Sequence, residues 1–178
     1  MKMSTGERQI LQTLDECINR PPARIVIDSI VERVELQLSK QSTALLAWEP
    51  IPLEIYGNGI PSFIKSSWVF VLRANTSSGA ERHPNSHQRV MSYRGKGDLQ
   101  VFEEEQWISN LLVSDDADPL EERWLSIPID VWHQAVVPGE NWVVVSFHTV
   151  SAEELIEERP DHGDSNVFHQ RRYMDETN

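Results

Sequence analysis

The side chains in this sequence with the clearest capacity for chemistry are its histidines and the acidic residue next to one of them. Glu81 and His83 are two residues apart, so on a β-strand both side chains project to the same face. His133 follows much later in the chain, and a closed sheet would return it to the first two. Neutral imidazole and carboxylate together suit Fe(II), Mn(II), Zn(II) or Ni(II). The residue types therefore predict a site for a divalent transition metal.

The segment 78–97 resembles the first conserved segment of the cupin superfamily. That segment has a glycine, the pattern His-x-His, an acidic residue and then a glycine turn. Counted back from Gly95 with the family's spacing, the acidic position is Gln88 and the second histidine is His83. Glu81 stands where the family has its first histidine. One ligand position thus matches, one is a carboxylate and one is an amide.

The segment 128–133 resembles the second conserved segment of the same superfamily. There, a proline, any residue, a glycine and two further residues precede a histidine. Pro128 and His133 keep this spacing, and Asp130 takes the place of the glycine. Aspartate enters the left-handed turn conformation of glycine more easily than most residues do. The two segments occur in the family's order, within roughly residues 65–150.

The resemblance implies an all-β fold, a cupin-type antiparallel β-barrel that is also described as a double-stranded β-helix or jelly roll. It also implies a metal site formed by Glu81, His83, His133 and one of two neighbouring residues. Gln88 is the neighbour that the family spacing selects. His87 is its rival, because positions 83, 85 and 87 share a face in an extended strand, although a proline and two polar residues between them favour a turn.

Three classes of function are open on this basis. The first is a metal-dependent cupin enzyme acting on a small molecule, as a dioxygenase or other oxidoreductase, or as an isomerase or lyase with the metal as Lewis acid. The second is a non-catalytic module that binds a small metabolite without metal, which the departures from the family's ligand set favour. The third is an assembly protein whose terminal segments build a homodimer, with Phe168 and Tyr173 as interface anchors.

Four further residues are candidates to line the pocket: Trp68, Phe70, Trp132 and His148. Aromatic side chains on strands belong to the core more often than to a ligand site. His148 shares a strand face with Trp142. It becomes a general acid or base if that face lines the barrel, and it is an ordinary strand histidine if the face does not.

Two helices are predicted ahead of the barrel. Ser4 and Glu7 have the spacing of a capping box before a helical apolar repeat, which ends at Pro21. The segment 24–48 fits a second helix, but the alternation over 34–38 also fits a strand.

From Trp48 onward the pattern is that of short strands. They are predicted over 50–56, 67–73, 88–92, 98–102, 107–113, 123–127 and 142–150. No long helical pattern intervenes, which favours an antiparallel barrel over βαβ units. A third capping pattern predicts a short C-terminal helix over 153–158. The expected organisation is a helical elaboration over 1–47, the barrel over 48–159 and a polar tail over 160–178.

Composition limits the partners. The 28 acidic and 16 basic residues give a net charge of −12, which would repel a nucleic-acid backbone. Cys17 is the single cysteine, so no internal disulfide forms. No stretch reaches the ~18 uninterrupted apolar residues of a membrane span, and no signal-peptide pattern opens the chain. We expect a cytoplasmic protein with a small-molecule ligand, no nucleic-acid or membrane partner, and a homodimeric state.

Overall fold

The chain opens with two helices joined at a pair of prolines. The computed structural model describes residues 3–161 and 164–175. Helix α1 (Thr5–Asn19) is capped by Ser4, whose hydroxyl accepts a hydrogen bond from the Glu7 N–H at 3.2 Å. Helix α2 (Pro21–Lys40) starts on the two prolines, because a proline in the first turn needs no N–H donor. The ambiguous stretch from residue 24 is therefore helical as far as Lys40.

Short strands make up most of the remaining described chain. They are β1 (Leu46–Ile51), β2 (Ser66–Leu72), β3 (Thr76–Ser77), β4 (Gln88–Arg94), β5 (Lys96–Glu103), β6 (Gln106–Ile108), β7 (Leu111–Val113), β8 (Trp124–Ile127), β9 (His133–Val137), β10 (Trp142–His148), β11 (Ile156–Asp161) and β12 (Asp164–Arg172). The 3₁₀ segment η1 (Leu53–Gly59) follows β1, a single helical turn, α3 (Leu120–Arg123), precedes β8, and the 3₁₀ turn η2 (Tyr173–Asp175) follows β12.

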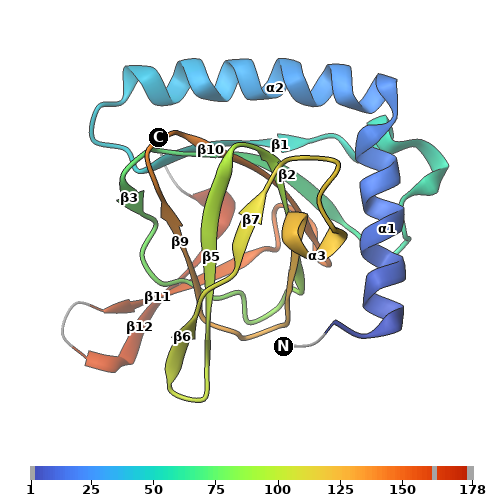
Figure 1. Cartoon of the computed structure of the whole chain (residues 1–178). Helices are drawn as coiled ribbons and strands as arrows, with labels where there is room; N and C mark the ends of the chain where they lie inside the picture. The colour runs from blue at the N-terminus through green and yellow to red at the C-terminus, as the bar shows by residue number, and fades with distance from the viewer. Residues whose placement is uncertain (1–2, 162–163, 176–178) are drawn as a thin grey trace.

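Two antiparallel sheets face each other and form the barrel (Figure 1). One has the order β1-β2-β10-β4-β8, and the other has the order β3-β9-β5-β6, with β7 also paired to β5. Most neighbours within a sheet are distant in sequence, as in the two interleaved Greek keys of a jelly roll. The predicted antiparallel jelly-roll barrel is confirmed. In the described part of the chain, no helix has both the length and the apolar composition required to cross a bilayer.

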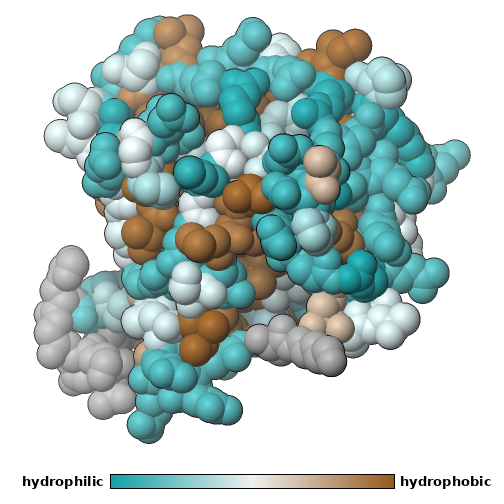
Figure 2. Space-filling model, viewed as in Figure 1, coloured by the Kyte–Doolittle hydropathy of each residue, from teal (hydrophilic) through white to brown (hydrophobic). Residues whose placement is uncertain are grey.

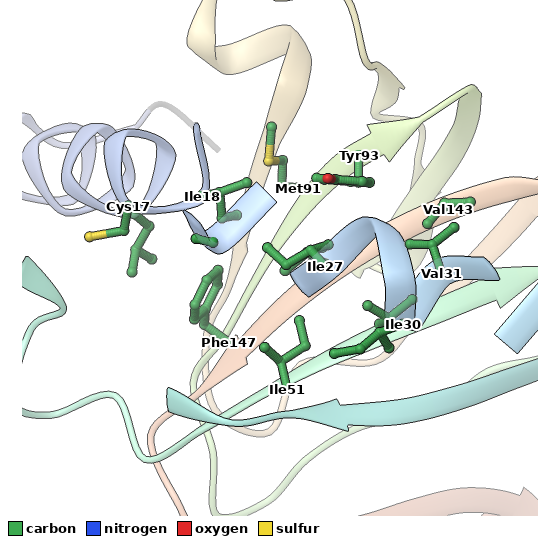
Figure 3. Packing of buried hydrophobic residues seen from close by; sticks show 14 of the residues in the cluster. Cys17, Ile18, Ile27, Ile30, Val31, Ile51, Met91, Tyr93, Val143 and Phe147 are labelled. Atoms are coloured by element: carbon green, nitrogen blue, oxygen red, sulfur yellow. The ribbon is translucent and has the colours of Figure 1, made fainter. Parts of the chain in front are cut away.

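The helices cover the outer face of the sheet that contains β10. In Figure 3, Ile18 of α1 and Ile27 and Val31 of α2 gather over Met91 and Phe147 of the sheet. The opposite face of β10 packs inside the barrel against the second sheet. Helix α2 lies along this sheet in Figure 1, with α1 beside it. The helices thus form an outer layer, and the space between the sheets is left for a site.

Some predicted boundaries differ from the structure. The strand expected over 50–56 ends at Ile51, and the one expected over 107–113 is divided into β6 and β7. The helix predicted over 153–158 is wrong, because the Ser151 carbonyl supports only a single turn before β11 starts. Leu155 ends that turn, buried against Trp68, and the following residues pair with β12. The short C-terminal helix is η2 instead.

Strands β11 and β12 form a hairpin in the region where a polar tail was expected. Arg82 ties this hairpin to the barrel, since its N–H and C=O both bond to the backbone of Glu158, each at 3.0 Å. Its guanidinium also bonds the Glu158 carboxylate at 2.7 Å and lies over the rings of Trp132 and Phe168. The hairpin is therefore fixed beside the segment that carries Glu81 and His83.

Candidate metal centre

Glu81 and His133 are directly opposite each other on neighbouring segments. The Glu81 N–H donates to the His133 carbonyl at 2.9 Å, and the His133 N–H donates back at 2.8 Å. Side chains of such a pair stand close together on one face. Glu81 Oε1 and His133 Nε2 are accordingly 3.5 Å apart. A pair of residues far apart in sequence is thus held by backbone bonds at the distance of two ligands of one ion.

The turn before His133 connects the two conserved segments. Asp130 has φ +68°, the left-handed conformation predicted for the position where cupins have glycine. Its N–H donates to the carbonyl of His83 at 3.0 Å. The turn therefore fixes the position of both histidines relative to each other.

Both histidines are held in one tautomer. His83 Nδ1 is 2.9 Å from the carbonyl of Ile156, and His133 Nδ1 is 3.1 Å from the carbonyl of Val131. A carbonyl only accepts, so each Nδ1 carries the proton and each neutral ring keeps its lone pair on Nε2. Backbone bonds of this kind orient metal-binding histidines. Both rings are thus prepared as Nε2 ligands.

An unsatisfied atom lies at the centre of the cluster. His133 Nε2 is buried and has no hydrogen-bond partner within the described chain. Its lone pair faces Glu81 Oε1, so two hydrogen-bond acceptors lie next to each other. This arrangement requires a positive charge between them. A proton or a metal ion meets that need. One ligand atom each from Glu81, His83 and His133 lies within 4.8 Å of the others.

Gln88, and not His87, faces this cluster. Gln88 lines the same inner cavity as Glu81 and His133, and its Oε1 is a second buried atom without a partner. His87 turns to the other side of the strand, where its Nε2 is 2.7 Å from the hydroxyl of Ser126. The geometry therefore brings four of the five predicted ligand residues together and separates the fifth.

Burial controls the protonation of the cluster. Desolvation lowers the pKa of His83 to about 4, with a further contribution from nearby His133. Desolvation also lowers the pKa of His148 well below its usual value. Burial alone would raise the pKa of Glu81, but interactions with His133 and with the Arg159 guanidinium outweigh it and keep that pKa well below the usual range. At neutral pH, the cluster therefore offers neutral imidazole at His83 and an ionised carboxylate.

Arg159 of β11 is a site residue that the sequence did not reveal. It donates to Glu81 Oε2 at 2.5 Å and to the Ser78 carbonyl at 2.9 Å. Its other partner is Glu157, a fully buried carboxylate that Arg171 also bonds. One oxygen of Glu81 is thus occupied by the guanidinium, and the other faces His133. The available signal was the spacing of Glu157 and Arg159, which places both side chains on one face of a strand.

Two spaces that share lining residues lie beside the cluster. The inner cavity, about 50 Å³, contains Glu81, Gln88 and His133 on its wall. A wider outer pocket of about 660 Å³ shares Ser78 and Tyr173 with it and is lined by Arg159 and Arg171 of the hairpin. A ligand that reaches the cluster from this side passes the hairpin.

The other predicted pocket residues divide between cavity and core. Phe70 lines the inner cavity. His148 lies behind His83, with ring centroids 5.1 Å apart, and contacts the hydroxyls of Ser86 and Ser146. Trp68 is buried in the core against Tyr173, and Trp132 lies under the guanidinium of Arg82.

The strand order and the placement of the two conserved segments decide the architecture. The fold is the cupin-type antiparallel jelly-roll barrel that the sequence predicted. No family model matches the sequence, and no curated protein matches it. Among solved structures, oxalate oxidase in complex with the substrate analogue glycolate is similar, with 14% identity and a TM-score of 0.45 over 60% of this chain and 52% of that one.

Other cupin structures give similar values. CapF with inhibitor 3-isopropenyl-tropolone has 12% identity and a TM-score of 0.48, over 62% of this chain and 29% of that one. Pumpkin seed globulin has 17% identity and a TM-score of 0.48, over 64% and 28%. This chain therefore spans about half or less of the length of these proteins. Likeness at this level of identity does not fix an activity.

Proposed function

We propose that this cupin barrel binds a divalent transition-metal ion through Glu81, His83 and His133 and acts as a metal-dependent oxidoreductase, of the dioxygenase type, on a small molecule. The observation that carries the proposal is the unpartnered Nε2 of His133, 3.5 Å from a carboxylate oxygen. Donor atoms around one ion are about 3.0–3.5 Å apart when each bond is about 2.1 Å long. This pair therefore already has the separation of two ligands.

The donor set fits the ion in type as well as in position. Two imidazoles and one carboxylate suit Fe(II), Mn(II), Zn(II) or Ni(II). Gln88 adds a neutral oxygen, which has no hydrogen-bond partner among the described residues. A nearby cation would give it one. When bound, the ion would supply an open position for substrate or O₂ and act as a Lewis acid. Arg159 holds Glu81 in place and keeps it ionised.

The dimensions of the cavity limit the substrate. The inner cavity of about 50 Å³ is far below the ~300–1,000 Å³ of pockets that enclose drug-sized ligands. Only a reacting group of a few atoms fits beside the ligands. A larger remainder would lie in the outer pocket, next to Arg159 and Arg171.

Elemental analysis tests the proposal. Untagged protein from a medium containing Fe, Mn, Zn and Ni is expected to hold about one ion per chain. His133→Gln, which is similar in size and uncharged, is expected to lose that ion while circular dichroism shows a folded protein. His169→Gln alters an exposed histidine of the hairpin and is the matched control. Wild-type protein that is folded, metal-free and cannot be loaded would contradict the metal site.

A metal-free binding module is the second candidate, favoured by the ion pair between Arg159 and Glu81. In that case the arginine is the lasting partner of the carboxylate, and a proton bridges Glu81 and His133. Failure of metal loading, together with saturable binding of a metabolite, would support this alternative. A homodimeric state and a cytoplasmic location remain predictions from the sequence.

A further inference from the structure

A second cavity lies away from the metal-ligand cluster. It has a volume of about 250 Å³ and lies between the N-terminal end of α1, strand β8 and the loop before β9. In Figure 1, the start of α1 lies on the same side of the barrel as that loop. Within the described chain, this cavity shares no lining residue with the inner cavity. It is therefore a separate space, to which the proposed metal site assigns no role.

On one wall of this cavity, the Glu7 carboxylate is already paired. Glu7 receives two hydrogen bonds from Arg89, at 2.7 and 3.0 Å, and one from the Ser126 hydroxyl at 2.6 Å. A carboxylate only accepts, so Ser126 uses its proton there, and the His87 Nε2 donates to the Ser126 oxygen at 2.7 Å. The negative charge of Glu7 is therefore compensated by Arg89, and this carboxylate is not left to bind a ligand.

Glu103 on the opposite wall is different. It ends β5, two residues after the buried Val101, so both side chains point inward. Its Oε1 is buried and has no hydrogen-bond partner within the described residues. A carboxylate oxygen that lacks a partner away from water is costly. The cavity thus has one carboxylate oxygen that no donor of the described residues satisfies.

The remaining lining is mainly apolar. Val101, Leu125, Pro128 and Val131 supply hydrocarbon surface around Glu103. A ligand that matches both features carries one positive charge with N–H donors and a short hydrocarbon body. We propose that this cavity is a binding site for a small primary alkylammonium compound, whose ammonium group bonds Glu103 and whose hydrocarbon portion packs on Val101 and Leu125.

Three probes of equal length separate charge from hydrocarbon. n-Butylammonium, butyrate and 1-butanol are titrated into the purified full chain by calorimetry and by NMR. Saturable binding of butylammonium in about the millimolar range is expected, which a ligand of about five heavy atoms can reach. Butyrate is expected not to bind, because its charge repeats that of Glu103. Butanol is expected to bind at least about tenfold more weakly than butylammonium, because it lacks the charge-assisted hydrogen bond.

A matched pair of variants locates the site. Glu103→Gln keeps the size and removes the charge, and it is expected to weaken butylammonium binding at least about tenfold. Glu105→Gln changes an exposed carboxylate in the adjacent turn and is expected to bind like wild type. Equal binding of butanol and butylammonium, no saturable binding, or an unchanged affinity of Glu103→Gln would overturn the proposal. Metal content, measured in parallel, is expected to be unchanged, so this site and the metal site fail independently.

Discussion

Gln88 is a neutral amide at a position where a metal site with two carboxylates would have a negative charge. Its amide lines the inner cavity with Oε1 buried and unpartnered. A neutral oxygen attracts a cation less than a carboxylate does. Glu81 is therefore the one charged ligand of the cluster, and Arg159 shares its charge. Ion binding weaker than at a site with two carboxylates, and a strong dependence on Glu81, follow from this arrangement.

Gln88→Glu is predicted to strengthen metal binding by about tenfold or more, because a second buried carboxylate gains most from a nearby 2+ ion. The same change is predicted to destabilise the metal-free protein by about 1–3 kcal/mol, since like charges then face each other without water. Competition titration with a chelator and urea unfolding measure the two effects. Gln134→Glu, on strand β9 of the facing sheet, is the control. Tighter binding without any loss of metal-free stability would contradict this account.

At the level of individual residues, the motifs predicted three members of the cluster. They did not predict which neighbour joins these three or that Arg159 bonds Glu81. Glu81, His83 and His133 follow from spacing along the chain. The choice between Gln88 and His87 depends on a bend whose direction no local pattern fixes. Arg159 is separated from Glu81 by 78 residues, so only the closed fold reveals their contact.

The β11–β12 hairpin is the element that completes the cluster. Its strands are rich in charged residues and poor in the β-branched types that favour strands, which explains why the sequence was interpreted as a tail. These two strands are stabilised by pairing with each other and with the backbone of Arg82, and not by the strand preference of their residues. At its centre, Glu157 is fully buried and bonded by Arg159 and Arg171.

Glu157→Gln is predicted to reduce the free energy of unfolding by about 1–3 kcal/mol, because two partly exposed guanidinium groups lose the buried carboxylate that bonds them. Urea unfolding measures the loss. Glu153→Gln, at an exposed position just before the hairpin, is expected to change stability by less than about 0.5 kcal/mol. Metal affinity is expected to change as well, since Arg159 loses one of its anchors. Equal stability of the two variants would show that the hairpin contributes little.

Local signals worked best where an element is formed by its own sequence. Helix α1 starts at its cap, and β2 and β10 are short apolar runs that pack on both sides. β3 has only two residues, and β9 is formed chiefly by its pairing with β5. The helix expected over 153–158 was wrong because Leu155 is drawn into the core, and tertiary packing overrides a capping pattern.

At the scale of the whole molecule, acid has two opposing effects. The net charge is −12 and the isoelectric point about 4.9, so acidification towards pH 5 relieves repulsion between carboxylates. Buried histidines act in the other direction. Burial lowers the pKa of His83 to about 4 and also lowers the pKa of His148 well below its usual value.

The metal-free protein is predicted to lose stability as the pH falls from about 6.5 to 4. The unfolded chain takes up protons on these histidines from their ordinary pKa of about 6.5 downward, whereas the folded chain resists protonation until about pH 4. His83 alone accounts for about 3 kcal/mol of this loss. Urea unfolding at several pH values measures the slope. His148→Gln is expected to reduce it and His169→Gln to leave it unchanged; a rise in stability towards pH 5 would mean that charge repulsion dominates.

The exposed surface is mainly polar, but apolar residues interrupt it. Figure 2 shows hydrophobic residues in the middle of the face formed by β5 and β7, where Leu111 is 72% exposed. Phe102 and Trp107 are also partly exposed and in contact at the β5–β6 end. The molecule thus combines a high net charge with local apolar contacts on the second sheet.

The position of β10 between β2 and β4 determines when the sheet can be completed during folding. Until Trp142–His148 is in place, β1–β2 and β4–β8 are two separate strand pairs, each with an open edge. Joining them needs contacts between distant parts of the chain, which makes folding slow. Open edges meanwhile pair with other molecules. Completion of this sheet thus depends on a central strand that is synthesised after its partners. Refolding yield is expected to fall as protein concentration rises, because open edges on different molecules then meet more often.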